Sequence, residues 1–157
     1  MKRTIPALFR GAVDEAPDHT WLLAGERVYT YSQALDEIER AASALRATGV
    51  DRGDRVLVTA RNTDQYLFTW LALMELGAVQ IPVNPKSSRA EMAGFVQQVT
   101  PRLVVTDDDL APLVEDAPLV DAGEIFTATP DGRGPADVDE GHVAVMIPTS
   151  GTTGRSK

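Results

Sequence analysis

The sequence predicts an α/β fold in which a largely parallel sheet is flanked by helices. Short apolar runs alternate with amphipathic segments that are long enough to cross back over a sheet. Capping-box spacings mark where helices begin, and glycines mark where they end. The 157 residues are 43% hydrophobic and 24% charged, which is typical of a folded protein and too apolar for intrinsic disorder.

The first elements are a helix and a hairpin. Residues 5–16 predict a helix that ends before Pro17. The β-prone runs 20–24 and 27–30 flank Gly25-Glu26, a pattern that favours a β-hairpin.

The next helix is predicted to begin at Thr30. Thr30 and Gln33 have the spacing in which a hydroxyl and an amide cap each other's backbone N–H groups. Apolar residues at three- and four-residue intervals then form one stripe: Leu35, Ile38, Ala42 and Leu45. Gly49 supplies the left-handed position that ends the helix.

A second helix, 64–76, is predicted to be buried between layers. Thr63 is positioned to cap it, Gly77 to end it, and its residues leave little polar face. Ser88 and Glu91 repeat the capping-box spacing and start a helix to about Val99. The remaining expected elements are strands at 55–60, 78–83, 102–106 and 143–147, a short helix at 110–115, and a surface loop at 128–142.

Charge and composition disfavour several functions. The net charge of −8 repels nucleic-acid backbones and anionic lipid surfaces. The longest mainly apolar run, Leu67 to Met74, is far too short to span a membrane, and no signal-peptide pattern opens the chain. Because there is no cysteine, disulfides and thiolate metal sites are excluded, and we expect a cytoplasmic protein.

One motif carries chemistry, and it directly follows the apolar run 143–147. Gly151 and Gly154 let the backbone approach a ligand closely. Successive N–H groups in such a turn form an anion-binding concavity, and Lys157 adds a positive charge suited to phosphate. The hydroxyls that can donate to anionic oxygens are those of Thr149, Ser150, Thr152 and Thr153.

Other interpretations of these residues are weaker. The lysine is misplaced for a Walker A loop, and no G-x-G-x-x-G is present; a flexible Ser/Thr/Gly linker is the remaining alternative. His142 precedes Ser150 by eight residues, but no G-x-S-x-G surrounds Ser150, which disfavours a hydrolase. The run 107–109 of three aspartates reads as a helix N-cap turn rather than a metal site.

The stretch from Thr149 to Lys157 resembles the phosphate-binding signature of the adenylate-forming superfamily, although Ser156 replaces the usual proline and Ile147-Pro148 stands where an aromatic is common. The rest of the chain follows that family in order. The matching segments are Thr30 to Leu35, Gly49-Val50 with Gly53 to Val56, Asn62, Gly77 to Val79, and Pro82 to Pro85.

The resemblance implies an ATP-dependent ligase. A carboxylate would attack the α-phosphorus of Mg-ATP, giving an acyl-adenylate and pyrophosphate, and a thiol of coenzyme A or a carrier protein would then displace AMP. Thr152, Thr153 and the amides near Gly151 and Gly154 would hold the β- and γ-phosphates with Lys157. An acyl-CoA synthetase, of the kind found in fatty acid metabolism, is the simplest form of this hypothesis.

The family's acyl pocket, magnesium-binding glutamate and catalytic lysine would lie beyond Lys157. We therefore expect residues 1–157 to be the N-terminal portion of an AMP-binding large domain, inactive alone, with no catalytic or metal-binding residue of its own. We also expect exposed apolar surface on 64–76 and 143–147, and self-association through it. The alternatives are a peptide-synthetase adenylation domain that loads a carrier protein, and a complete phosphate-binding or regulatory module.

Overall fold

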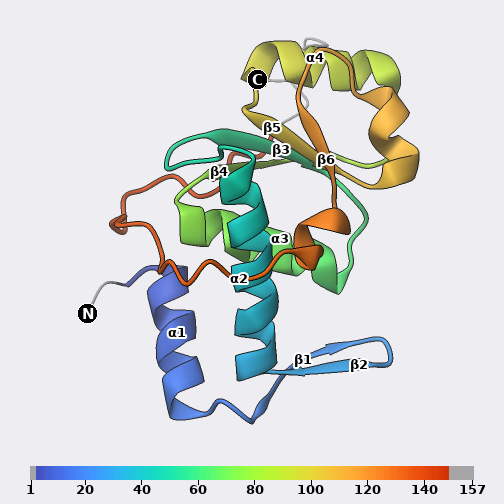
Figure 1. The fold of residues 1–157 in the computed structure, drawn as a ribbon. Helices are drawn as coiled ribbons and strands as arrows, with labels where there is room; N and C mark the ends of the chain where they lie inside the picture. The colour runs from blue at the N-terminus through green and yellow to red at the C-terminus, as the bar shows by residue number, and fades with distance from the viewer. Residues whose placement is uncertain (1–2, 149–157) are drawn as a thin grey trace.

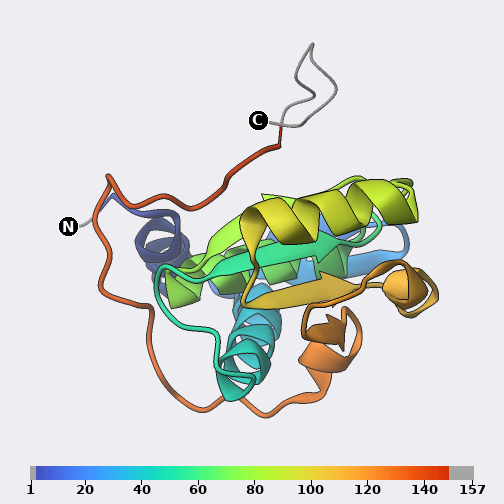
Figure 2. The same ribbon diagram turned by 90° about the horizontal axis from the view of Figure 1, so that it is seen from above.

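The computed structural model describes residues 3–148, and its centre is a parallel sheet. The strand order is β4 (Val79–Pro82), β3 (Arg55–Thr59), β5 (Leu103–Thr106), β6 (Leu119–Asp121). Helices α2 (Tyr31–Ala47) and α3 (Asp64–Leu76) cover one face of this sheet, and α4 (Arg89–Val99) covers the other (Figure 2). This arrangement confirms the predicted α/β class with flanking helices.

The N-terminal elements lie beside the α2 and α3 layer (Figure 1). Helix α1 (Ile5–Glu15) packs against both helices, and a hairpin of β1 (Thr20–Ala24) and β2 (Arg27–Thr30) leads into α2. Both elements were predicted at these positions.

Alternation along the strands divides the interior into two cores. In β3, Val56 and Val58 point to the core shared with α2 and α3, whereas Leu57 points to the core beneath α4. Strand β5 repeats the pattern: Val104 points to the core beneath α4, whereas Leu103 and Val105 point to the core shared with α2 and α3. Strands buried on both faces explain why their sequences are continuously apolar.

The predicted helix caps are present. The Gln33 N–H donates to Thr30 Oγ1 at 3.2 Å, and the Thr30 N–H donates to Gln33 Oε1 at 3.0 Å. Ser88 and Glu91 form the second capping box, at the start of α4. Gly77 ends α3 with a φ of 64°, the left-handed region that favours glycine.

A buried carboxylate fastens the hairpin to the start of α3. Asp64 has no exposed side-chain area, and it accepts hydrogen bonds at 2.6 Å from Arg27 Nη2 and from the Tyr29 hydroxyl. Burial, together with the hydrogen bond to the Asp64 carboxylate, raises the pKa of Tyr29 to about 12. The hydroxyl therefore stays protonated and keeps donating to Asp64 across the neutral range.

Helix α1 is held by a second charged cluster. Arg10 donates from Nε and Nη2 to the two oxygens of Glu75, each at 3.1 Å, and from Nη2 to Glu39 at 3.0 Å. Burial lowers the pKa of Arg10, but the two carboxylates outweigh it and raise the pKa overall. The Glu75 side chain is only 5% exposed, so this pairing compensates a buried charge in α3.

Three short elements differ from the sequence expectations. The helix predicted at 110–115 is the 3₁₀ helix η1 (Asp108–Leu113), which contains Pro112 and makes no side-chain cap bond from Asp107. Proline lacks the N–H that an α-helix would need there. Strand β6 and the 3₁₀ helix η2 (Glu124–Thr127) were not predicted, because each is too short for a periodic pattern.

The strand expected at 143–147 is reduced to a single parallel bridge, Gln80 with Val145. Gln80 donates its N–H to the Ala144 carbonyl and accepts from the Met146 N–H, both at 2.9 Å. The next rungs of a parallel ladder would need N–H groups from Pro82 and Pro148, which proline does not have. The ladder therefore stops after one residue.

The expectation about exposed apolar surface was half right. Val143, Met146 and Ile147 are 52%, 49% and 72% exposed, as predicted for this segment. Helix α3, in contrast, keeps its cover, since most of its residues are buried. No helix within residues 3–148 is both long and apolar enough to cross a membrane.

The Asp64 cluster generates a stability prediction. Tyr29→Phe removes a hydrogen bond to a buried carboxylate and should lower the free energy of unfolding by about 1–3 kcal/mol. Tyr31→Phe is the matched control, because the Tyr31 hydroxyl has no hydrogen bond recorded within residues 3–148. Urea denaturation of the three proteins at neutral pH measures the difference.

The same pair has a defined pH dependence. The folded pKa of Tyr29 is raised above its ordinary value of 10, so its contribution is complete below pH 10 and is lost as pH rises toward 12. The stability difference between wild type and Tyr29→Phe should shrink over that window. A difference that is constant from pH 9 to pH 12 contradicts the assignment.

Candidate functional site

The predicted phosphate-binding residues lie outside the part of the chain that the structure describes. The residues concerned are Thr149, Ser150, Gly151, Thr152, Thr153, Gly154 and Lys157. What the structure does describe is the segment that leads to them, as far as Pro148, and the surface of the sheet beside it.

Residues 143–148 lie along the outer edge of β4. The bridge at Gln80 is parallel, so this segment runs in the same direction as the four strands of the sheet. It therefore advances toward the edge where the strands' carboxyl ends lie. In open α/β sheets this is the edge where ligands bind.

The strand connections diverge at that edge. The chain leaves the end of β3 for α3 on one face, whereas it leaves the end of β4 for α4 on the opposite face (Figure 2). Adjacent parallel strands whose connections diverge in this way leave a gap between their carboxyl ends. The segment ending at Pro148 lies beside β4, one of these two strands.

An arginine clip joins two strand ends at the same edge. Arg61 follows β3, and its guanidinium contacts Asp107 at 2.8 Å and Asp109 at 2.5 Å, after β5. Its backbone N–H also donates to Asp107. The pKa of Arg61 is raised and that of Asp109 lowered by their mutual hydrogen bonds. The aspartate run does lie at the predicted turn between a strand and a helix, but Asp107 makes no side-chain cap bond, because Asp107 and Asp109 bind Arg61 instead.

The clip leaves little capacity for binding ions. Two carboxylates neutralise the Arg61 charge, so this guanidinium is not a free anion-binding group. Among residues 3–148, no group of three or more His, Asp or Glu side chains is placed to hold a metal ion.

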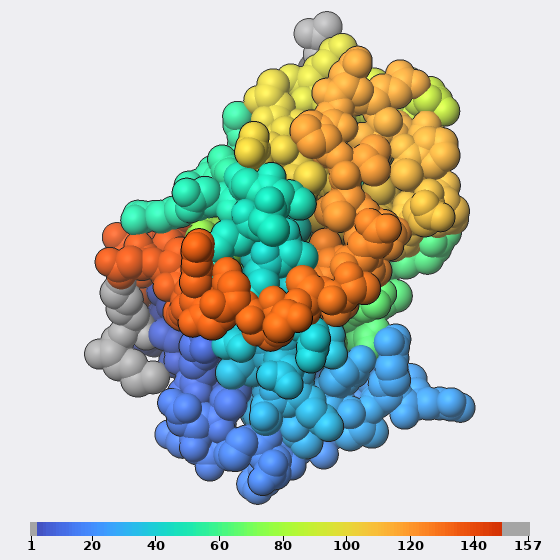
Figure 3. Space-filling model, viewed as in Figure 1, coloured from blue at the N-terminus to red at the C-terminus, as the bar shows by residue number. Residues whose placement is uncertain are grey.

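Residues 128–142, predicted as a surface loop, form a strap that crosses the surface over α2 (orange to red in Figure 3). The Asp131 N–H donates to Ser43 Oγ at 2.9 Å, and the Ala136 N–H donates to the Glu75 carbonyl at 2.6 Å. Val138 is 8% exposed, so the strap is pinned by a buried side chain as well. It then continues into residues 143–148.

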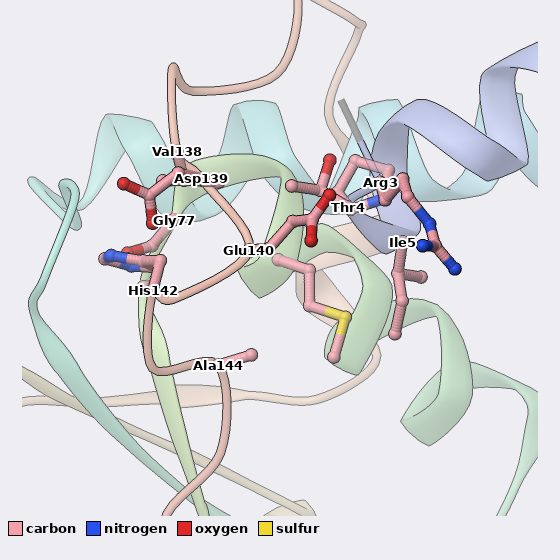
Figure 4. Close-up of a pocket in the computed structure, with 12 residues that line it drawn as sticks. Arg3, Thr4, Ile5, Gly77, Val138, Asp139, Glu140, His142 and Ala144 are labelled. Atoms are coloured by element: carbon pink, nitrogen blue, oxygen red, sulfur yellow. The ribbon is translucent and has the colours of Figure 1, made fainter. Parts of the chain in front are cut away.

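The end of the strap borders a cavity of about 180 Å³ beside the start of α1 (Figure 4). Apolar side chains of Met74, Ala78 and Ala144 contribute to its walls, and Arg3 and Glu140 also line it. In the same view, the His142 ring points to the Gly77 carbonyl, 2.7 Å away. The hydrolase-type pairing of His142 with Ser150 that the sequence analysis disfavoured is not tested by the structure. Ser150 lies outside the described residues.

Comparison with known proteins shows which family the sequence matches. Residues 9–157 match the model of the AMP-binding enzyme family. The chain belongs to the AMP-binding enzyme family. The adenylate-forming resemblance of the sequence is thereby confirmed.

Several known proteins resemble the chain along almost its whole length. A CoA ligase of Mycobacterium tuberculosis is 31% identical over 182 aligned residues, covering 99% of this chain and 36% of that protein. Surfactin synthase subunit 1 of Bacillus subtilis is 25% identical, covering 98% of this chain and 4% of that protein. The N-terminal subdomain of NpsA from Klebsiella oxytoca has the same fold, with a TM-score of 0.88 at 22% identity over 99% of this chain and 41% of that one.

The chain corresponds to only part of each relative. The chain spans 17–36% of the length of the curated CoA ligases that it matches. The relatives include CoA ligases and a fatty acid–acyl-carrier-protein ligase of Streptomyces coeruleorubidus, so the general ligase class is shared while the acceptor named for these relatives differs.

The sequence patterns did not indicate several residues that position the segment 143–148. Gln80 carries the one bridge, Pro82 ends it, and His142 reaches back to Gly77. The prolines are a signal that could have been used, because a proline on each strand forbids a long ladder. The contact between Gly77 and His142 joins residues 65 positions apart, and no local pattern indicates it.

Gly77 generates the prediction for this site. A Cβ at Gly77 would lie 2.9 Å from Val138 Cγ1, and its φ of +64° also strains any other residue. Gly77→Ala should lower the free energy of unfolding by about 1–3 kcal/mol more than Gly25→Ala. Gly25 is the matched control, since its φ is +63° but nothing lies within 4 Å of its added Cβ.

Thermal or urea unfolding of the two variants separates backbone strain from steric clash. Equal destabilisation by the two substitutions would mean that the strap does not pack on Gly77 in solution.

Proposed function

We propose that residues 1–157 form the N-terminal portion of the large domain of an ATP-dependent, AMP-forming carboxylic acid–thiol ligase. Membership of the AMP-binding family is the observation that supports this most strongly, because the matched region includes the glycine–hydroxyl–lysine stretch. The parallel placement of residues 143–148 beside β4, one of the two strands whose connections diverge, agrees with it. In this proposal the 157 residues are inactive alone.

The stretch Thr149 to Lys157 would bind the triphosphate of ATP. Hydroxyls of Thr152 and Thr153, with backbone N–H groups near Gly151 and Gly154, would donate to the β- and γ-phosphate oxygens. Lys157 would balance charge on the departing pyrophosphate, and magnesium would arrive bound to ATP as part of the substrate. The contribution of these residues is positioning and electrostatic stabilisation, with no proton transfer.

Coenzyme A is the proposed thiol acceptor, since the first relatives in the comparison are CoA ligases. A carrier-protein thiol is the second candidate. The relatives that favour it are a fatty acid–acyl-carrier-protein ligase and peptide synthetases. A cytoplasmic location, a role in fatty acid metabolism and self-association through the exposed residues near Ile147 stay predictions.

Thr152→Val and Lys157→Ala, made in the full-length natural polypeptide, should each slow adenylate formation by at least about tenfold, roughly 1.4 kcal/mol. Each removes a donor or charge from the phosphates in the transition state. ATP–pyrophosphate exchange, measured with an acid selected from a panel of organic acids, reports this step.

Thr20→Val is the control, because Thr20 is an exposed threonine on the β1–β2 hairpin. Its exchange rate should equal that of wild type. Unchanged exchange in both loop variants would refute the assignment of this stretch to ATP phosphates.

A further inference from the structure

The contact between His142 and Gly77 lies in register with the bridge that follows it. His142 is 65 residues after Gly77, and Val145 is 65 residues after Gln80. Both contacts therefore belong to one alignment of residues 142–145 with residues 77–80. The His142 side chain supplies a rung of this alignment before the backbone ladder begins.

Gly77 offers a fixed acceptor for that rung. Its N–H is bonded to carbonyls at the end of α3, and its carbonyl accepts the Gly53 N–H at 2.8 Å. A carbonyl oxygen has a second lone pair, which the His142 ring nitrogen meets at 2.7 Å. Because a carbonyl only accepts, this ring nitrogen, Nε2, carries the hydrogen and donates it.

The hydrogen bond between His142 and Gly77 is important because few other hydrogen bonds hold residues 142–148 in place. For residues 142–148, the hydrogen bonds to β4 and to the turn before it that the structure records are the pair at Gln80 and the His142 contact. Pro82 and Pro148 prevent further backbone rungs toward the loop. The register of this pairing is important, because a slip of one residue in a strand reverses which of its side chains face the core.

We propose that His142 is a positioning residue, which fixes the register of residues 143–148 on β4 and thereby the point from which the phosphate-binding stretch begins. The proposal rests on the proposed function, since it assigns His142 a role in Mg-ATP binding without contact to ATP. The His142 ring also keeps the end of the strap close to the end of α3, where Val138 is already buried.

The test compares donors of different reach in the full-length natural polypeptide. The terminal amide of His142→Gln reaches about as far as Nε2, whereas the amide of His142→Asn is one bond shorter. His142→Ala and His142→Asn should weaken Mg-ATP binding about fivefold, and His142→Gln should bind within about twofold of wild type. His19→Ala, which alters an exposed histidine, should leave binding unchanged.

Calorimetric titration with Mg-ATP gives these affinities, and amide hydrogen exchange tests the cause. His142→Asn should speed exchange of the Met146 N–H, which donates to Gln80, but not of the Val83 N–H, which donates to Val58 within the sheet. A merely destabilising change would speed both.

The outcomes separate the two proposals. A wild-type protein that does not bind Mg-ATP overturns the proposed function. A wild type that binds, with His142→Asn binding equally well or with Met146 exchange unchanged, overturns the role of His142. If His142→Ala does not fold, the comparison of His142→Gln with His142→Asn decides the matter.

Discussion

One residue, Gln80, joins the segment before the glycine–hydroxyl–lysine stretch to the sheet. Its N–H and carbonyl make the pair of hydrogen bonds that places residues 144–146 on β4. Prolines 82 and 148 confine the pairing to this point. The chain is thus held parallel to the strands as far as Met146 and then leaves the ladder, in the direction of the carboxyl edge, where open α/β sheets bind ligands.

The C-terminal end of α3 holds the segments that lie next to the bridge between Gln80 and Val145. Glu75 connects α1 through Arg10 and the strap through its own carbonyl. Two residues later, Gly77 ends the helix and accepts from both the Asp51–Asp54 turn and His142. The buried end of α3 therefore holds three segments that are far apart in the sequence: α1, the strap and the Asp51–Asp54 turn. Strand β4 begins directly after this helix end, so its position is fixed as well.

Much of the fold could be predicted because it follows from local rules. The caps at Thr30 and Ser88, the left-handed glycines and the continuously apolar strands gave the α-helices and three of the four sheet strands at their observed places, within a residue or so. The exceptions are short or depend on tertiary contacts. Strand β6 has three residues, and η1 is a 3₁₀ helix that contains Pro112.

The candidate site divides in the same way. Its chemistry stays a prediction from residue types alone, because glycines, hydroxyls and a lysine in one stretch are typical of phosphate binding. Its support could not be predicted, because Arg61 meets Asp107 and His142 meets Gly77 across 46 and 65 residues. Such contacts depend on how the helices and strands pack together, and local sequence patterns do not indicate them.

The central claim is that residues 149–157 bind the phosphates of ATP at the carboxyl edge of this sheet. Hydrogen–deuterium exchange of the full-length polypeptide, with and without saturating Mg-ATP, tests it most directly. We predict that the peptide covering 149–157 exchanges at least about tenfold more slowly with nucleotide, while the β1–β2 hairpin is unaffected. Nucleotide binding that leaves this peptide unprotected, with protection elsewhere in the molecule, would contradict the account.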